Sequence, residues 1–160
     1  MALHPDILFL AAPPERPRSV YPSYSGGEGH DASLLRRRGA PLRILIAEDE
    51  ALAAMDIQSI VSDHGGEVVG VAARGGEAVD KAVAATPDVV LMDVHLIGEI
   101  DGVEAARRIR DRCRIPVVFV TAHGDPDTLR RMFEVAPMAP VIKPIMPRRL
   151  CDAILRACRD

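Results

Sequence analysis

The sequence lacks the features that mark disulfide-stabilised, membrane-spanning or nucleic-acid-binding proteins. Its three cysteines are an odd number without a C-x-x-C pair, which argues against a disulfide framework and a zinc site. No apolar run approaches the roughly 20 residues of a membrane helix, and no basic segment leads into a secretory signal. The 20 basic and 23 acidic residues give a net charge of −3, which provides no basic field for nucleic acid or anionic lipid. We therefore expect a cytoplasmic protein with reduced cysteines and no membrane or nucleic-acid partner.

Nucleotide-binding loops are also missing. Neither a P-loop nor a G-x-G-x-x-G turn occurs, which removes nucleotide-driven functions. What is present is a chain of 160 residues with 48% hydrophobic residues, enough for one folded domain with or without a tail.

Proline and glycine divide the chain into two parts. Residues 1–41 contain six of the 13 prolines and show no sustained apolar period. We predict a disordered Pro/Gly-rich tail over residues 1–41 and a folded domain over residues 42–160. The basic cluster Arg36–Arg38 in this tail would contact phosphate or an acidic partner, or would simply be solvated, and we favour the solvated linker.

Beyond residue 41, five short apolar runs alternate with five amphipathic stretches. The runs predict strands over residues 42–47, 67–72, 89–92, 116–120 and 141–142. The stretches predict helices over residues 51–64, 76–86, 103–113, 127–135 and 147–158. Near-continuous Val/Ile/Leu strands separated by helices indicate an α/β fold: a doubly wound, five-stranded parallel sheet with five helices.

Polar residues whose side chains can take part in binding or catalysis follow four of these strands. They are Glu48 and Asp49, Asp93, Thr121, and Lys143. The carboxyl ends of parallel strands form one edge of the sheet, where ligands bind in such folds. Two carboxylates 4 Å apart repel by about 4 kcal/mol at an effective dielectric of 20, so the three acids need a cation or a shared proton. A divalent cation is the natural solution, and Mg²⁺ suits a small, open oxygen site. An ammonium and a hydroxyl beside them suit a phosphoryl group, so the set indicates phosphoryl transfer to a carboxylate.

Several separated motifs resemble one known family. They are Ile-Ala-Glu-Asp-Glu at 46–50, Pro-Asp-Val-Val-Leu-Met-Asp at 87–93, Asp-Gly-Val-Glu at 101–104, Pro-Val-Val-Phe-Val-Thr-Ala at 116–122 and Lys-Pro at 143–144. In this order they resemble the CheY-like receiver domain of two-component response regulators, which has a flavodoxin-like fold. The resemblance runs from about Leu42 to Ala157.

The resemblance implies a role for each site residue. Asp93 would be the phosphoacceptor. The Mg²⁺ ligands would be Asp49, Asp93, the carbonyl oxygen of His95, and Glu48 directly or through water. The phosphoryl group would be contacted by Thr121, Lys143 and the backbone N–H groups of Val94 and Ala122. His123, two residues after the threonine, would modulate the lifetime of the phosphate or have no influence.

The sequence departs from the family's pattern at two places. Pro140 stands three residues before the lysine, where the family usually has Tyr or Phe, so the common aromatic switch is missing. The loop after the third strand carries a Gly-containing segment, Leu96–Ile100, instead of the usual proline. We therefore expect the response to phosphorylation to appear mainly in the loops after the third and fourth strands.

These observations predict a single-domain response regulator, with no output domain after Asp160. It would accept a phosphoryl group from a sensor histidine kinase or a histidine phosphotransfer protein and act by binding an unidentified downstream protein. It would catalyse only its own phosphorylation and dephosphorylation.

Two other functions stay open. One is a receiver scaffold that binds partners without phosphorylation. The other is an aspartyl-phosphate phosphohydrolase, which is opposed by His95 at the position where such enzymes need a second acid. The individual residues also have ordinary structural explanations: Glu48 or Asp49 as a helix cap, Thr121 as a turn residue, and Lys143 as a solvated lysine before a proline.

Overall fold

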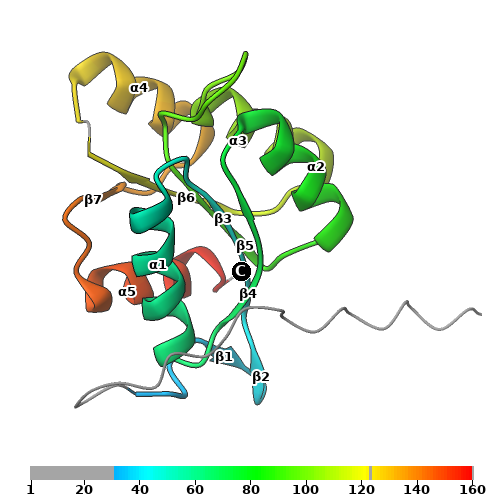
Figure 1. The fold of residues 1–160 in the computed structure, drawn as a ribbon, viewed down its shortest axis with the longest axis vertical. Coiled ribbons are helices and arrows are strands. Elements are labelled where there is room, and N and C mark those ends of the chain that lie inside the picture. The colour runs from blue at the N-terminus through cyan, green and yellow to red at the C-terminus, as the bar shows by residue number, and fades with distance from the viewer. Residues whose placement is uncertain (1–30, 123, 160) are drawn as a thin grey trace, which may run out of the picture.

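A parallel sheet of five strands lies at the centre of the molecule (Figure 1). The computed structural model describes residues 31–122 and 124–159. Its central strands are β3 (Arg43–Ala47), β4 (Glu67–Ala72), β5 (Val89–Met92), β6 (Val117–Thr121) and β7 (Val141–Ile142). Their order is β4-β3-β5-β6-β7, so the direction of winding reverses between β3 and β5.

Five helices cover the two faces of this sheet. They are α1 (Ala51–Asp63), α2 (Gly75–Ala85), α3 (Gly102–Cys113), α4 (Pro126–Val135) and α5 (Pro147–Ala157). Helices α2, α3 and α4 share one buried cluster with the sheet, and α1 and α5 share the other. The predicted doubly wound fold is therefore confirmed, and every predicted bound of these ten elements lies within one residue of the observed one.

Burial on both faces explains the continuous apolar strands. In β3, Ile44 and Ile46 pack on the side of α1 and α5, whereas Leu45 and Ala47 pack on the side of α2 and α3. Successive strand residues point to opposite faces, so a sheet covered on both sides needs apolar residues at every position. All five residues of β3 are buried, including Arg43 at its amino end.

The predicted boundary at residues 41/42 is wrong for residues 31–41. These residues form an ordered hairpin of β1 (Arg36–Arg37) and β2 (Ala40–Pro41), with positive φ at Gly39 in the turn. Leu35 is fully buried, and its backbone N–H donates to the carbonyl oxygen of His64 over 2.8 Å. One buried leucine makes no periodic pattern, so the packing of this hairpin was not predictable from the sequence. The predicted disorder of residues 1–30 falls outside the described residues.

Within residues 31–122 and 124–159, no helix is long and apolar enough to cross a membrane.

Candidate functional site

The register of the sheet brings the predicted site residues to one edge. Ala47 of β3 pairs with Met92 of β5, so the next residues, Glu48 and Asp93, leave the sheet side by side. The backbone N–H of Asp93 donates to the carbonyl oxygen of Ala47 over 2.9 Å. On the other side, the N–H of Lys143 donates to the carbonyl oxygen of Thr121 over 3.0 Å. The fold therefore gathers the ends of β3, β5, β6 and β7, as the sequence predicts.

Lys143 joins the two buried carboxylates. Its Nζ lies 2.6 Å from Glu48 Oε2 and 2.8 Å from Asp93 Oδ2. Glu48 and Asp93 are only 3% and 6% exposed. Burial of charged groups costs free energy unless a counter-charge and hydrogen bonds compensate, and Lys143 provides both. Lys143 is therefore an integral part of the site and not a solvated surface lysine.

The pKa values of Glu48 and Lys143 are both raised, but for different reasons. Burial raises the pKa of Glu48, helped by the nearby Asp93 carboxylate and opposed by hydrogen bonds from Lys143 and from the Glu50 N–H. For Lys143, burial alone would lower the pKa, but the hydrogen bonds to Asp93 and Glu48 outweigh it and raise the pKa above 10.5. The ammonium group therefore stays charged at neutral pH.

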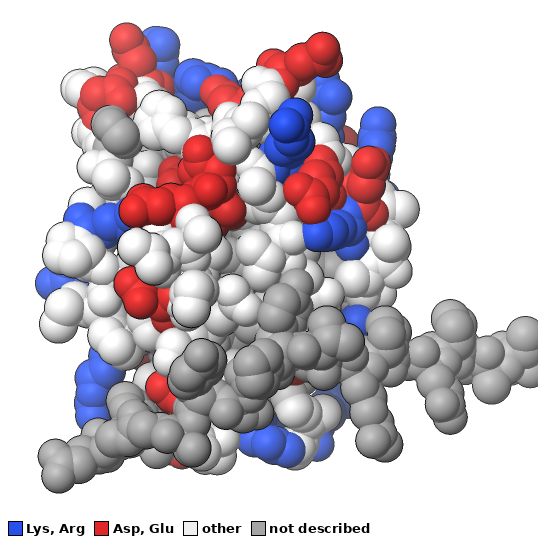
Figure 2. Space-filling view, viewed as in Figure 1, with Lys and Arg blue, Asp and Glu red and all other residues white. Residues whose placement is uncertain are grey.

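Three carboxylates are close enough to share one metal ion. Oxygen atoms of Glu48, Asp49 and Asp93 lie within 4.8 Å of one another. Figure 2 shows acidic side chains gathered over this end of the molecule, above α1. Three negative charges face the single positive charge of Lys143, so the excess charge and the oxygen donors fit a hard divalent cation such as Mg²⁺. The capping alternative for Asp49 does not hold, because α1 has no side-chain cap and its N-cap residue is Glu50.

The other predicted contact residues that the structure describes lie at the ends of β5 and β6. The backbone N–H of His95 donates to Asp93 Oδ1 over 3.1 Å, and the His95 side chain is exposed. Val94 is buried, Thr121 is fully buried at the end of β6, and Ala122 is exposed beside it. His123 lies outside the described residues, so its predicted modulating role has no structural description.

Gly102 supports the backbone of Asp93, a role that the sequence reasoning did not assign. A Cβ atom at Gly102 would lie 1.7 Å from the carbonyl oxygen of Asp93 and 2.9 Å from Cα of Val94. The N–H of Gly102 donates to the carbonyl oxygen of Val94 over 2.8 Å. The start of α3 therefore packs against the peptide that carries the predicted phosphoacceptor, and only glycine leaves room for this contact.

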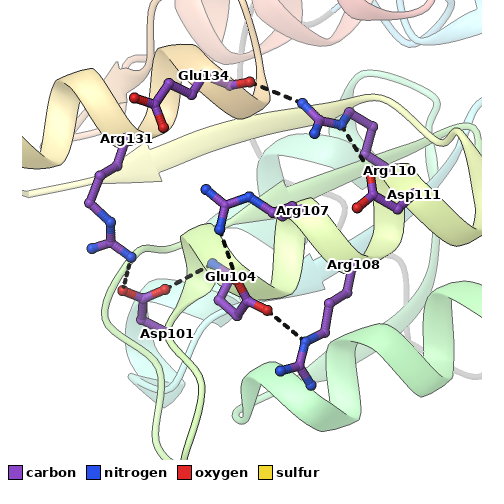
Figure 3. Close-up of polar contacts among 8 residues, drawn as sticks. All are labelled: Asp101, Glu104, Arg107, Arg108, Arg110, Asp111, Arg131 and Glu134. Carbon is purple, nitrogen blue, oxygen red and sulfur yellow. Dashed lines mark hydrogen bonds and ion pairs between the residues drawn. The ribbon is translucent and has the colours of Figure 1, made fainter.

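A second unpredicted feature ties α4 to the same region (Figure 3). Asp101 caps α3 by accepting a hydrogen bond from the N–H of Glu104 over 2.9 Å, and its other oxygen lies 2.6 Å from Arg131 of α4. At the far end of these helices, Arg110 donates to the carbonyl oxygens of Glu134 and Val135. Arg131 lies 30 residues from Asp101 in sequence, so no local pattern reveals the pair.

Comparisons with known proteins agree with this geometry. A family model described as the response regulator receiver domain matches residues 44–155. The transcriptional regulatory protein PdtaR of Mycobacterium tuberculosis is 40% identical over 114 residues, which cover 71% of this chain and 55% of PdtaR. The phyllosphere-induced regulator PhyR of Methylorubrum extorquens is 33% identical over 115 residues, covering 71% of this chain and 42% of PhyR. The chain thus matches about half the length of these relatives.

A solved structure of a receiver domain is also similar to this chain. The signal receiver domain of a modulated diguanylate cyclase from Desulfovibrio desulfuricans superposes with a TM-score of 0.71 at 35% identity. The match covers 74% of this chain and 94% of that domain.

Proposed function

The chain belongs to the response regulator receiver domain family, and from this premise we propose that it is switched by phosphorylation of Asp93. The observation that carries the proposal is the placement of Asp93: a buried carboxylate at a strand end, hydrogen-bonded to Lys143 and within a cluster of three acids. A nucleophile with a fixed cation beside it is arranged for charge that develops during phosphoryl transfer.

The chemistry follows from these side chains. An oxygen of Asp93 attacks the phosphorus atom, an O–P bond forms, and the bond between phosphorus and the donor's leaving group breaks, with its electron pair going to that group. Mg²⁺, held by Glu48, Asp49, Asp93 and the His95 carbonyl, would supply positive charge that neutralises the phosphoryl oxygens.

Side chains and backbone N–H groups of the protein would bind the phosphoryl group. The ammonium group of Lys143 would pair with one phosphoryl oxygen, and the Thr121 hydroxyl would donate to another. The N–H groups of Val94 and Ala122 would hold the phosphoryl group in place, and His123 would influence how long it survives.

The donor that fits this site is a phosphorylated histidine of a sensor histidine kinase or a histidine phosphotransfer protein. PdtaR and PhyR are named as regulators, which supports an output through binding of a downstream protein. We place this exchange in the cytoplasm, and we propose no catalysis beyond the chain's own phosphorylation and dephosphorylation.

The absence of an aromatic residue at Pro140 affects which elements would respond to phosphorylation. The ion pair between Asp101 and Arg131 connects the loop after β5 to α4 without needing a ring at residue 140. We therefore place the response mainly in the loops after β5 and β6. NMR shift changes on adding a phosphoryl mimic should concentrate there, with smaller changes over residues 150–158. Comparable or larger changes across β7 and α5 would contradict this route.

A labelling experiment tests the proposal directly. The full chain is treated with a small phosphodonor and Mg²⁺, and intact mass is followed. Wild type should gain one phosphate and Asp93→Asn none, whereas Asp56→Asn, which removes an exposed acid on α1, should label normally. Labelling of Asp93→Asn would refute the assignment, and an unlabelled wild type would favour the scaffold that binds without phosphorylation.

A further inference from the structure

The amino ends of the strands, opposite the acidic site, carry a large groove. It has a volume of about 1130 Å³ and lies between the end of α3, the segment before β7, and α5. Its apolar floor includes Ile115, Val117, Val141 and Ala153. Strand β7 is the edge of the sheet, so no further strand covers this side.

The N-terminal hairpin extends this groove. A second, smaller groove of about 430 Å³ shares Arg37 and Cys158 with the first and is lined by residues of the hairpin and of α5. Arg37 donates to the carbonyl oxygen of Cys158 over 3.1 Å and so fixes the junction. The hairpin precedes the family match, which covers residues 44–155.

Arginine dominates the lining of the two grooves, which we call the arginine groove. It contains Arg36, Arg37, Arg38, Arg110, Arg114, Arg149, Arg156 and Arg159. Only Asp88 and Asp152 oppose these eight, a surplus of six positive charges on a chain with a net charge of −3. Figure 2 shows basic side chains at the lower margin, over the hairpin, and a mixture of acidic and basic side chains towards the opposite end.

Several arginines of α3 and α4 that lie outside the groove form ion pairs with acidic side chains. Outside the groove, Arg107 and Arg108 pair with Glu104, and Arg131 pairs with Asp101. Inside it, the exposed side chains of Arg114 and Arg156 make no hydrogen bond or ion pair with another described residue.

Where groove arginines do bond, their partners are mostly backbone carbonyls. Arg36 donates to the carbonyl oxygen of Gly39, Arg37 to that of Cys158, and Arg110 to those of Glu134 and Val135. Among the described residues, Arg110 is the one groove arginine that also forms an ion pair, 3.4 Å from Asp111. The guanidinium groups of the groove therefore remain available for an external anion.

The combination of an apolar floor and a guanidinium rim selects the class of ligand. Guanidinium groups bind carboxylates in a bidentate manner, and an apolar floor takes up aliphatic side chains. No aromatic residue lines either groove, so single-stranded nucleic acid would find no ring on which its bases stack. We propose that the arginine groove docks an acidic amphipathic segment of a partner protein, at a site remote from Asp93 and independent of its phosphorylation.

The test measures binding of defined probes to the full chain. The main probe is a designed helical peptide with glutamates on one face and leucines on the other. A polyglutamate of equal length and charge and an oligouridylate RNA serve as comparisons. The groove variant is Arg114→Glu/Arg156→Glu. The matched control, Arg112→Glu/Arg130→Glu, makes the same charge change at exposed arginines outside the groove.

The amphipathic peptide should bind wild type more tightly than the polyglutamate or the RNA does. It should also shift the NMR signals of Ile115, Val117, Val141 and Ala153. The groove variant should weaken this binding at least tenfold and the control less than threefold. Equal losses of peptide affinity in both variants would overturn the proposal. So would binding of polyglutamate or RNA that is as tight as that of the peptide or tighter. Self-association of the chain that only the groove variant abolishes would overturn it as well. Both variants should keep phosphodonor labelling, so failure here is distinguishable from failure of the proposed function.

Discussion

Replacing Gly102 by alanine separates helix propensity from the demands of the site. Gly102 begins α3, and in an open helix position Gly→Ala stabilises by up to about 1 kcal/mol. Here the new Cβ would lie 1.7 Å from the Asp93 carbonyl oxygen and 2.7 Å from its carbonyl carbon. Because both atoms belong to the backbone, no side-chain rotation relieves the clash, and the strand end or the helix must move by roughly 1 Å or more.

The magnitude follows from this displacement. Overpacking of a close-packed interior costs about 1–3 kcal/mol, which exceeds the gain in helix propensity, so Gly102→Ala should lower the free energy of unfolding. A misplacement of about 1 Å of a reacting group costs on the order of 100-fold in rate. We therefore expect phosphodonor labelling of Asp93 to slow by about 10- to 100-fold, although no reacting group is removed.

The assay combines urea denaturation with time-resolved intact-mass labelling, so that the rate is corrected for the folded fraction. Gly76→Ala is the matched control, because Gly76 lies in the first turn of α2 with no heavy atom within 4 Å of its added Cβ. The control should keep wild-type labelling and equal or greater stability. Wild-type stability and labelling rate in Gly102→Ala would refute the reasoning that this contact positions Asp93.

Three further predictions concern the hairpin, the metal and pH. Leu35→Ala should lower the free energy of unfolding by about 2–4 kcal/mol in urea denaturation, because Leu35 is fully buried, whereas Leu52→Ala, at a residue 71% exposed, should change it by less than about 0.5 kcal/mol. Mg²⁺ should raise the melting temperature of wild type by mass action, and a shift of equal size in Asp49→Ala would place the cation elsewhere. Burial acts to raise the pKa of Asp101, but hydrogen bonds from the Glu104 N–H and from Arg131 outweigh it and hold the pKa below 3.8. The stability that this carboxylate contributes is therefore present above pH 3.8 and lost as pH falls through its lowered pKa, so the deficit of Asp101→Asn at pH 7 should shrink near pH 3.

The sequence by itself determined the order of elements and the chemistry at the sheet edge. Continuous apolar runs such as Val89–Met92 are a local signal, because a strand covered on both faces needs an apolar residue at every position. Parallel strands end at a common edge, so the residues after each run, including Asp93 and Lys143, were predictable as neighbours before any coordinates. The missing aromatic at Pro140 is likewise a fact of sequence alone.

Only the tertiary structure decided which distant residues meet. Leu35 is one apolar residue in a Pro/Gly-rich segment, and its burial depends on the end of α1. The need for glycine at residue 102 arises because the backbone of Asp93 passes against it, and the pairing of Asp101 with Arg131 depends on the crossing of α3 and α4. The arginine groove is assembled from the hairpin, α3 and α5, whose arginines lie up to about 120 residues apart in sequence. Such contacts are set by packing between elements, which hydrophobic periodicity does not encode.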